Sequence, residues 1–185
     1  SSGLQLVNGA IVPVGALVKI IVATENDIIN KLSGNLQING TLDITTARIN
    51  NTSGVGPSVT IATGGVLKSS NSGGFSGGGA AIISEPIILE TNSTIEFNRA
   101  GDQNFNSRSD FKNLTFSGSG IKKPASGFDP VGTVKISGTA VLDCTGHNVG
   151  DGSINANLTM DGGRLIVSTG STQPGMGGVY NISGG

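Results

Sequence analysis

This chain of 185 residues contains no tryptophan, one histidine and one cysteine, and only 4% of its residues are aromatic. A single histidine excludes a metal site built from several histidines. His147 follows a glycine and is expected to be a solvent-facing turn residue. Cys144 falls at an inward position of an alternating segment, which predicts a small buried hydrophobic side chain. An intermolecular disulfide is the alternative for Cys144.

Charge is scarce and balanced: 12% of the residues are charged, with 11 Lys and Arg against 12 Asp and Glu. A nucleic-acid-binding surface needs a basic face, and single-strand binders interleave aromatic residues with it. The chain has neither pattern, so no nucleic-acid partner is expected. Long apolar runs are also missing. The stretch "GALVKIIVA" (15–23) is too short to span a bilayer and is interrupted by Lys19, so no membrane insertion is predicted.

The chain is instead rich in glycine, with 31 residues, and in short alternating segments. In "VKISGTAVLDC" (134–144) apolar and polar residues alternate on both sides of Gly138. The segment "LQINGTLDI" (36–44) repeats the pattern around Gly40. Successive side chains of a strand point to opposite faces, so this alternation places one row inside and the other in water. Each glycine is expected to form a corner with a positive φ, which residues with a side chain resist.

These segments recur at intervals of 20 to 28 residues. Their first apolar residues are Leu36, Val59, Ile87, Leu114, Val134, Leu158 and Tyr180. Imperfect repeats of this length, built of strands and glycine corners, are typical of a solenoid whose stacked coils share one core. We therefore predict an all-β fold: a parallel β-helix (β-solenoid) of about 7–8 irregular coils with little or no helix. The best candidate for a helix is "TENDIINKL" (24–32), after a possible Thr24 cap.

The solenoid is expected to form a single domain over residues 1–185. Its inner row follows from the alternation, because every second residue of a segment faces the core. The residues predicted to face inward are Leu36, Ile38, Leu42, Ile44, Ile95, Phe97, Val134, Ile136, Leu142, Leu158, Met160, Leu165 and Val167.

Two stretches, "FKNLTFSGSGIKKPASGFDPVGTVKISGTAVLDCTGHNV" (111–149) and "INANLTMDGGRLIV" (154–167), carry a family resemblance. They resemble the β-helical repeat regions of large secreted, adhesin-like surface proteins of Bacteroidota. In those regions "NLT-x-SGSG-x-K" followed by "V-x-GTL-x-L" recurs many times. The resemblance covers roughly residues 95–167 and implies an extracellular, adhesin-like or fibrous role. It carries no catalytic residue to this chain.

A charged cluster between residues 96 and 123 is the candidate ligand site. The possible ligand patch consists of Glu96, Arg99, Arg108, Asp110 and Lys112. Polysaccharide-cleaving β-helices gather acids and bases on one lateral face, where they reach a sugar ring. The alternative is a long surface loop whose charges are solvated and whose phenylalanines cap the core. No catalytic, cofactor-binding or metal-binding residue is predicted, since the glycine–aspartate nonapeptide of calcium β-rolls is absent from the sequence.

These observations favour a structural, non-enzymatic β-solenoid, extracellular or at the cell surface. It would form or extend a surface fibre or adhesin stalk by end-to-end stacking. The alternative is a carbohydrate-binding or polysaccharide-cleaving β-helix protein with surface carbohydrate as its partner. The repeats carry no evident polar cap, and open solenoid ends need a cover. We expect that cover to be other copies stacked head to tail, or flanking repeats of the same chain, which makes this domain a segment or subunit of a longer fibre.

Overall fold

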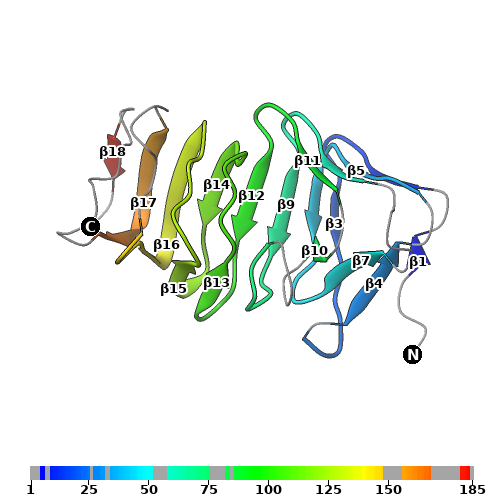
Figure 1. Cartoon of the computed structure of the whole chain (residues 1–185), viewed down its shortest axis with the longest axis horizontal. Helices are drawn as coiled ribbons and strands as arrows, with labels where there is room; N and C mark the ends of the chain where they lie inside the picture. Colours follow the sequence, from blue (N-terminus) through cyan, green and yellow to red (C-terminus); the bar gives the residue numbers. More distant parts are fainter. Residues whose placement is uncertain are drawn as a thin grey trace.

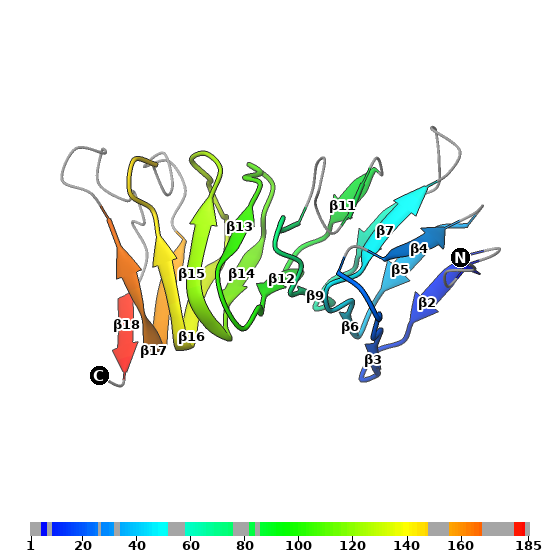
Figure 2. The same ribbon diagram turned by 90° about the horizontal axis from the view of Figure 1, so that it is seen from below.

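The computed structural model describes residues 5–6, 9–25, 27–31, 34–51, 58–75, 82–83, 86–147, 156–167 and 180–183. Within these residues the fold is all-β, with parallel strands stacked into a β-solenoid and no helix (Figures 1 and 2). The predicted fold class is therefore confirmed. The candidate helix at 24–32 is wrong: Ile28–Lys31 form strand β4, after a turn in which the Asp27 N–H donates to the Thr24 carbonyl.

The strands form three parallel sheets. Sheet A contains β1 (Gln5–Leu6), β4 (Ile28–Lys31), β7 (Arg48–Asn51) and β10 (Ile82–Ile83). Sheet B contains β2 (Ala10–Val12), β5 (Leu36–Ile38), β8 (Val59–Ile61) and β11 (Ile87–Leu89). Sheet C contains β3 (Leu17–Lys19), β6 (Thr41–Asp43), β9 (Val66–Ser69), β12 (Thr94–Phe97), β13 (Gln103–Phe105), β14 (Asn113–Phe116), β15 (Ser119–Pro124), β16 (Thr133–Asp143), β17 (Asn157–Ile166) and β18 (Tyr180–Ser183).

The stack amounts to about 5 turns, not the 7–8 that one coil per repeat predicts. Early turns have three sides, because the chain passes through sheets B, C and A in that order. Sheet B ends at β11, so the later repeats add strands to sheet C alone. The long strands β16 and β17 bend at glycines, and the two halves of β16 pair with different strands, β14 and β15. A repeat in this part is therefore less than a three-sided turn.

The repeats also change phase around the solenoid. Leu36, Val59 and Ile87 stack on one another in sheet B, as the repeat alignment predicts. Leu114, however, pairs with Ile95 of sheet C and not with Ile87. The opening strand of the motif thus belongs to sheet B in early turns and to sheet C in later ones. The sequence hides this change because both corners carry a glycine between apolar triplets.

Sheet C supplies two inward rows that run along the stack. One row consists of Leu42, Leu67, Ile95, Leu114, Val134 and Leu158, all buried. The other consists of Ser69, Phe97, Phe116, Ile136 and Met160. Burial of one such apolar side chain stabilises a fold by about 1.5–3 kcal/mol. A single turn cannot bury its own row, so the stacking itself creates the core.

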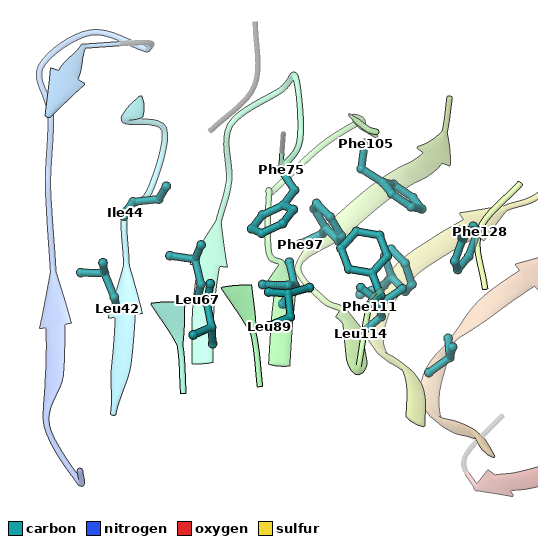
Figure 3. Close-up of a cluster of buried hydrophobic side chains, with 14 of the residues drawn as sticks. Leu42, Ile44, Leu67, Phe75, Leu89, Phe97, Phe105, Phe111, Leu114 and Phe128 are labelled. Carbon is teal, nitrogen blue, oxygen red and sulfur yellow. The ribbon is translucent and has the colours of Figure 1, made fainter. Parts of the chain in front are cut away.

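All six phenylalanines of the chain are buried, and they lie between residues 75 and 128 on either side of β11 (Figure 3). Phe97 and Phe116 pair across β12 and β14, with ring centroids 5.5 Å apart and planes within 13° of parallel. Phe105 contacts both rings, at 4.7 and 5.2 Å. The large rings fill the interior at the place where sheet B stops lining it. They are part of the core and do not cap it from a loop.

The inner-row prediction is largely confirmed: ten of the thirteen residues are buried. Met160 and Leu165 are only half-buried. Val167 is wrong, since it is 45% exposed. β17 ends at Ile166, so Val167 lies beyond the last paired residue, where alternation no longer fixes the direction of a side chain.

The two corner glycines of the motif are needed for different reasons. Gly138 has φ +65°, as predicted, and the nearest atom to an added Cβ is 3.5 Å away. Gly40 does not have a positive φ, so that part of the prediction is wrong. A Cβ at Gly40 would instead overlap the carbonyl oxygen of Pro13 and lie 2.6 Å from that of Ala16. One corner requires backbone freedom and the other requires space.

Substitutions at these two corners should therefore behave differently. Gly138→Val should lower the free energy of unfolding by about 1–2 kcal/mol, the cost of a left-handed conformation, and Gly138→Asn by less, because Asn tolerates that region. Gly40→Asn should be strongly destabilising, because the clash involves backbone atoms. Urea denaturation of the three variants would measure this. Equal effects of Asn at both positions would contradict the two explanations.

Ile136 lies in the second inward row of sheet C and is fully buried. Ile136→Asp should lower the free energy of unfolding by more than about 3 kcal/mol, because an unpaired carboxylate would be buried in an apolar row. Val167→Asp is the matched control and should have little effect at its exposed position. Thermal unfolding of both variants tests the row assignment; a melting temperature of Ile136→Asp within a few degrees of the parent would refute it.

Candidate functional site

Glu96, the first residue of the predicted ligand patch, lies in an outward row of sheet C. Its Oε2 is 2.8 Å from the Lys68 Nζ, and its Oε1 accepts a hydrogen bond from the Ser117 hydroxyl at 2.7 Å. The register continues this row through Asp43 to Lys19, whose Nζ lies 3.9 Å from the Asp43 carboxylate. Charges of opposite sign thus alternate along four adjacent strands. Such cross-strand pairs stabilise a sheet and leave Glu96 paired on the rod surface.

Arg99 lies at the corner after β12, where it bonds to the distant residue Glu25. Its Nη1 donates to Glu25 Oε1 at 2.8 Å and its Nη2 to Oε2 at 3.3 Å. The same Nη1 donates to the Ser70 carbonyl at 2.8 Å. Glu25 also accepts from the Ser72 N–H at 2.8 Å. The guanidinium is therefore engaged within the fold.

Arg108 and Asp110 form a local fork in the turn between β13 and β14. Arg108 Nε and Nη2 donate to the two carboxylate oxygens of Asp110 at 2.7 and 2.6 Å. The hydrogen bonds from Arg108 are the largest cause that holds the pKa of Asp110 below its usual value, and partial burial opposes them. The positive charge of Lys112 acts in the same direction as Arg108. Of the five patch residues, the structure brings these three together.

The region 96–123 is not a long surface loop, because it includes β13, β14 and most of β12 and β15. Its five predicted site residues lie in three places: an outward row, a corner and a turn. The two carboxylates among them, Glu96 and Asp110, each pair with a cation of their own. The part of the chain that the structure describes therefore does not join them into one acid pair of the kind that glycoside hydrolysis uses.

Lys122, a member of the charged cluster, is fully buried. Its ammonium donates to three backbone carbonyls: Arg99 at 2.6 Å, Ser119 at 2.8 Å and Gly101 at 2.9 Å. Burial, and then the charge of Arg99, lowers the pKa of Lys122 to about 8. In register next to it, the buried Gln103 donates to the carbonyls of Ser69 and Asn71. Polar side chains thus satisfy the carbonyls at this corner from inside the solenoid.

The inward position of Lys122 could have been found from the sequence. Counting every second residue from Leu114 reaches Lys122 at the place that Leu142 occupies in the next repeat, and the two pair in sheet C. We grouped Lys122 with the surface charges because lysine is rarely buried. The roles of Glu25 and Gln103 had no such signal, because their partners are set by the shape of corners.

Cys144 is buried, which confirms the prediction of a small hydrophobic side chain. Burial, and then the charge of Asp143, raises the pKa of its thiol to about 12, so the nucleophilic thiolate is scarce at neutral pH. Among the described residues there is no group of three or more His, Cys, Asp and Glu side chains that could hold a metal ion. The same residues include no helix long and apolar enough to span a membrane.

Comparison of the chain with protein-family models, with curated proteins and with solved structures gives no match. The resemblance to Bacteroidota surface proteins stays a prediction that rests on the quoted motifs. The fold is established by the strand pairing.

The lowered pKa of Lys122 predicts the pH dependence of stability. The ordinary pKa of the group is 10.5 and the folded value is about 8. Between these values the unfolded chain binds a proton that the folded chain has released, so the free energy of unfolding should rise as the pH is raised from 8 to 10.5. Chemical denaturation across this range, compared with Lys122→Met, tests it. The variant should lose this rise, and parallel curves would contradict the prediction.

Proposed function

We propose that this chain is a structural, non-enzymatic segment of an extracellular or cell-surface fibre or adhesin stalk. The rod is extended end to end by further β-solenoid coils, from a second copy or from flanking repeats of the same chain. The observation that carries the proposal is the run of sheet C along the whole stack. Its outer strands in the described residues are β3 and β18, at opposite ends of the rod (Figures 1 and 2).

The edge strands β3 and β18 have the polarity needed for head-to-tail extension. All strands of the sheet are parallel, so β18 of one copy placed beside β3 of another continues the sheet without reversal. A heterologous contact of this kind repeats along one direction and forms a fibre. The added turn would sit one strand spacing, about 4.8 Å, from the last.

The first turn supports this extension through its exposed apolar side chains. Val18 points inward beside the buried Leu42 but is 39% exposed, because in the described residues no strand covers β3 on its other side. Further exposed side chains surround it on the same turn: Ile11, Val14, Leu17 and Ile21. The outward neighbours of Ile11 and Leu17 in the next turn are polar, Gln37 and Thr41. Clustered exposed apolar residues are typical of a contact surface.

The alternative, a carbohydrate-binding or polysaccharide-cleaving β-helix, has less support. Sugar-binding surfaces use exposed aromatic rings, and all six phenylalanines of this chain are in the core. The candidate patch residues pair with one another or with the fold. A rod with paired charges on its sides and apolar residues at one end suits a structural segment better.

Sedimentation velocity at increasing protein concentration tests the end-to-end contact. The parent chain should form progressively longer species. Val18→Lys should weaken association at least a hundredfold, because a stacked turn would bury an unpaired ammonium at a cost of about 3 kcal/mol or more. Ile88→Lys is the matched control: Ile88 is similarly exposed, at 47%, but lies outward on β11 in the middle of the rod.

Two results would refute the proposed contact. One is a parent chain that stays monomeric at every concentration. The other is an equal loss of association in Val18→Lys and Ile88→Lys, which would indicate sideways packing instead of end-to-end stacking.

A further inference from the structure

The bond between Glu25 and Arg99 joins parts of the rod that are not neighbours. Glu25 lies in the turn between β3 and β4, and Arg99 follows β12. In sheet C, the strands β6 and β9 separate β3 from β12. The carboxylate also accepts the Ser72 N–H, from the corner that follows β9. One side chain of the first turn therefore reaches the third and fourth strands of the sheet directly.

All other contacts described at this corner connect adjacent levels of the stack. The Thr45 hydroxyl donates to the Ile20 carbonyl, and the Ser70 N–H donates to the Thr45 carbonyl. The Asn98 N–H then donates to the Ser69 carbonyl. In a solenoid held only by such nearest-neighbour contacts, stability is a sum over adjacent units, and the terminal unit opens first.

Both ends of the Glu25–Arg99 bond are held in place. The turn that carries Glu25 is closed by two hydrogen bonds between Thr24 and Asp27. The Arg99 N–H donates to the Gln103 side chain, and the Arg99 carbonyl accepts from the buried Lys122 ammonium. The two charged side chains are only 31% and 26% exposed. A bidentate pair anchored in this way contributes more than a mobile surface pair does.

We infer that the Glu25–Arg99 pair is an axial tie that makes the first four levels of sheet C, from β3 to β12, open as one unit. The terminal turn cannot separate from β6 while Glu25 remains bonded beyond β9. Opening it requires either breaking the tie or opening the intervening levels with it. The lowered pKa of Glu25 agrees with a bonded carboxylate: partial burial raises it, but the bonds from Ser72 and Arg99 outweigh this effect.

The tie has a consequence for the proposed stalk, although it does not depend on that function. A rod loaded along its axis fails first at a terminal turn that can peel away alone. Linking the turn to the fourth level spreads the load over four strands. This part of the inference rests on the proposed function, whereas the coupling itself is a property of the isolated chain.

Native-state hydrogen exchange on the dilute, monomeric protein tests the tie. In the parent chain, amides of β3, β6 and β9 should exchange through a common opening. In Glu25→Gln, amides of β3 and β6 should exchange roughly tenfold faster, since a charge-assisted pair is lost, and protection should increase stepwise toward β12. Amides of β14 to β17 should be unchanged. Arg99→Lys, which keeps the charge but loses the fork, should give an intermediate increase.

Asp110→Asn is the matched control, because it breaks a bidentate arginine pair between residues two positions apart. It should leave exchange at β3 and β6 unchanged. The inference is overturned if Glu25→Gln leaves the β3 and β6 amides as in the parent, or if exchange accelerates equally along the whole rod. Because the measurement uses monomers, the result is independent of whether rods associate end to end.

Discussion

The fold depends on the in-register parallel pairing of sheet C. Each residue of one strand lies beside the equivalent residue of the next, so every property of a side chain is repeated or opposed one level away. Phe97 on Phe116 and Leu67 on Ile95 are productive because they are alike. Lys68 between Asp43 and Glu96 is productive because they are opposite. A like charge in that row, or a polar residue in the Leu67 row, would oppose its neighbours on both sides.

The same constraint explains how far the sequence could be read. Alternation in short segments is sufficient to predict the strands, their parallel stacking and most of the core, because inward direction depends only on parity. It could not predict the change of phase between β11 and β14. Gly40 and Gly138 stand in similar letters, but one turns the chain into sheet C and the other turns it out of the first part of β16. Only the pairing of Ile95 with Leu114 distinguishes the two corners.

The candidate site was less predictable than the core. A cluster of charges in the sequence indicates only that charged residues are near one another along the chain. The structure divides this cluster by direction: Glu96 points outward on a strand, Arg108 and Asp110 close on each other, and Lys122 points inward. Direction was readable for Lys122 from parity. For Arg99 it was not, because it follows the last residue of β12, where the corner sets its direction.

The change of phase and the buried polar residues have a common physical origin. When sheet B ends, the corner after β12 must adapt a three-sided turn to the shape of the later repeats. Its carbonyls then lack regular strand partners, and an unpaired buried carbonyl is costly. Lys122 and Gln103 supply the missing donors from inside, while the phenylalanines fill the volume that sheet B no longer lines. Arg99, fixed at this corner, is consequently rigid enough to hold Glu25 two strands beyond its neighbour. The tie along the rod is thus a product of the irregularity in its middle, which a uniform stack of identical coils would not provide.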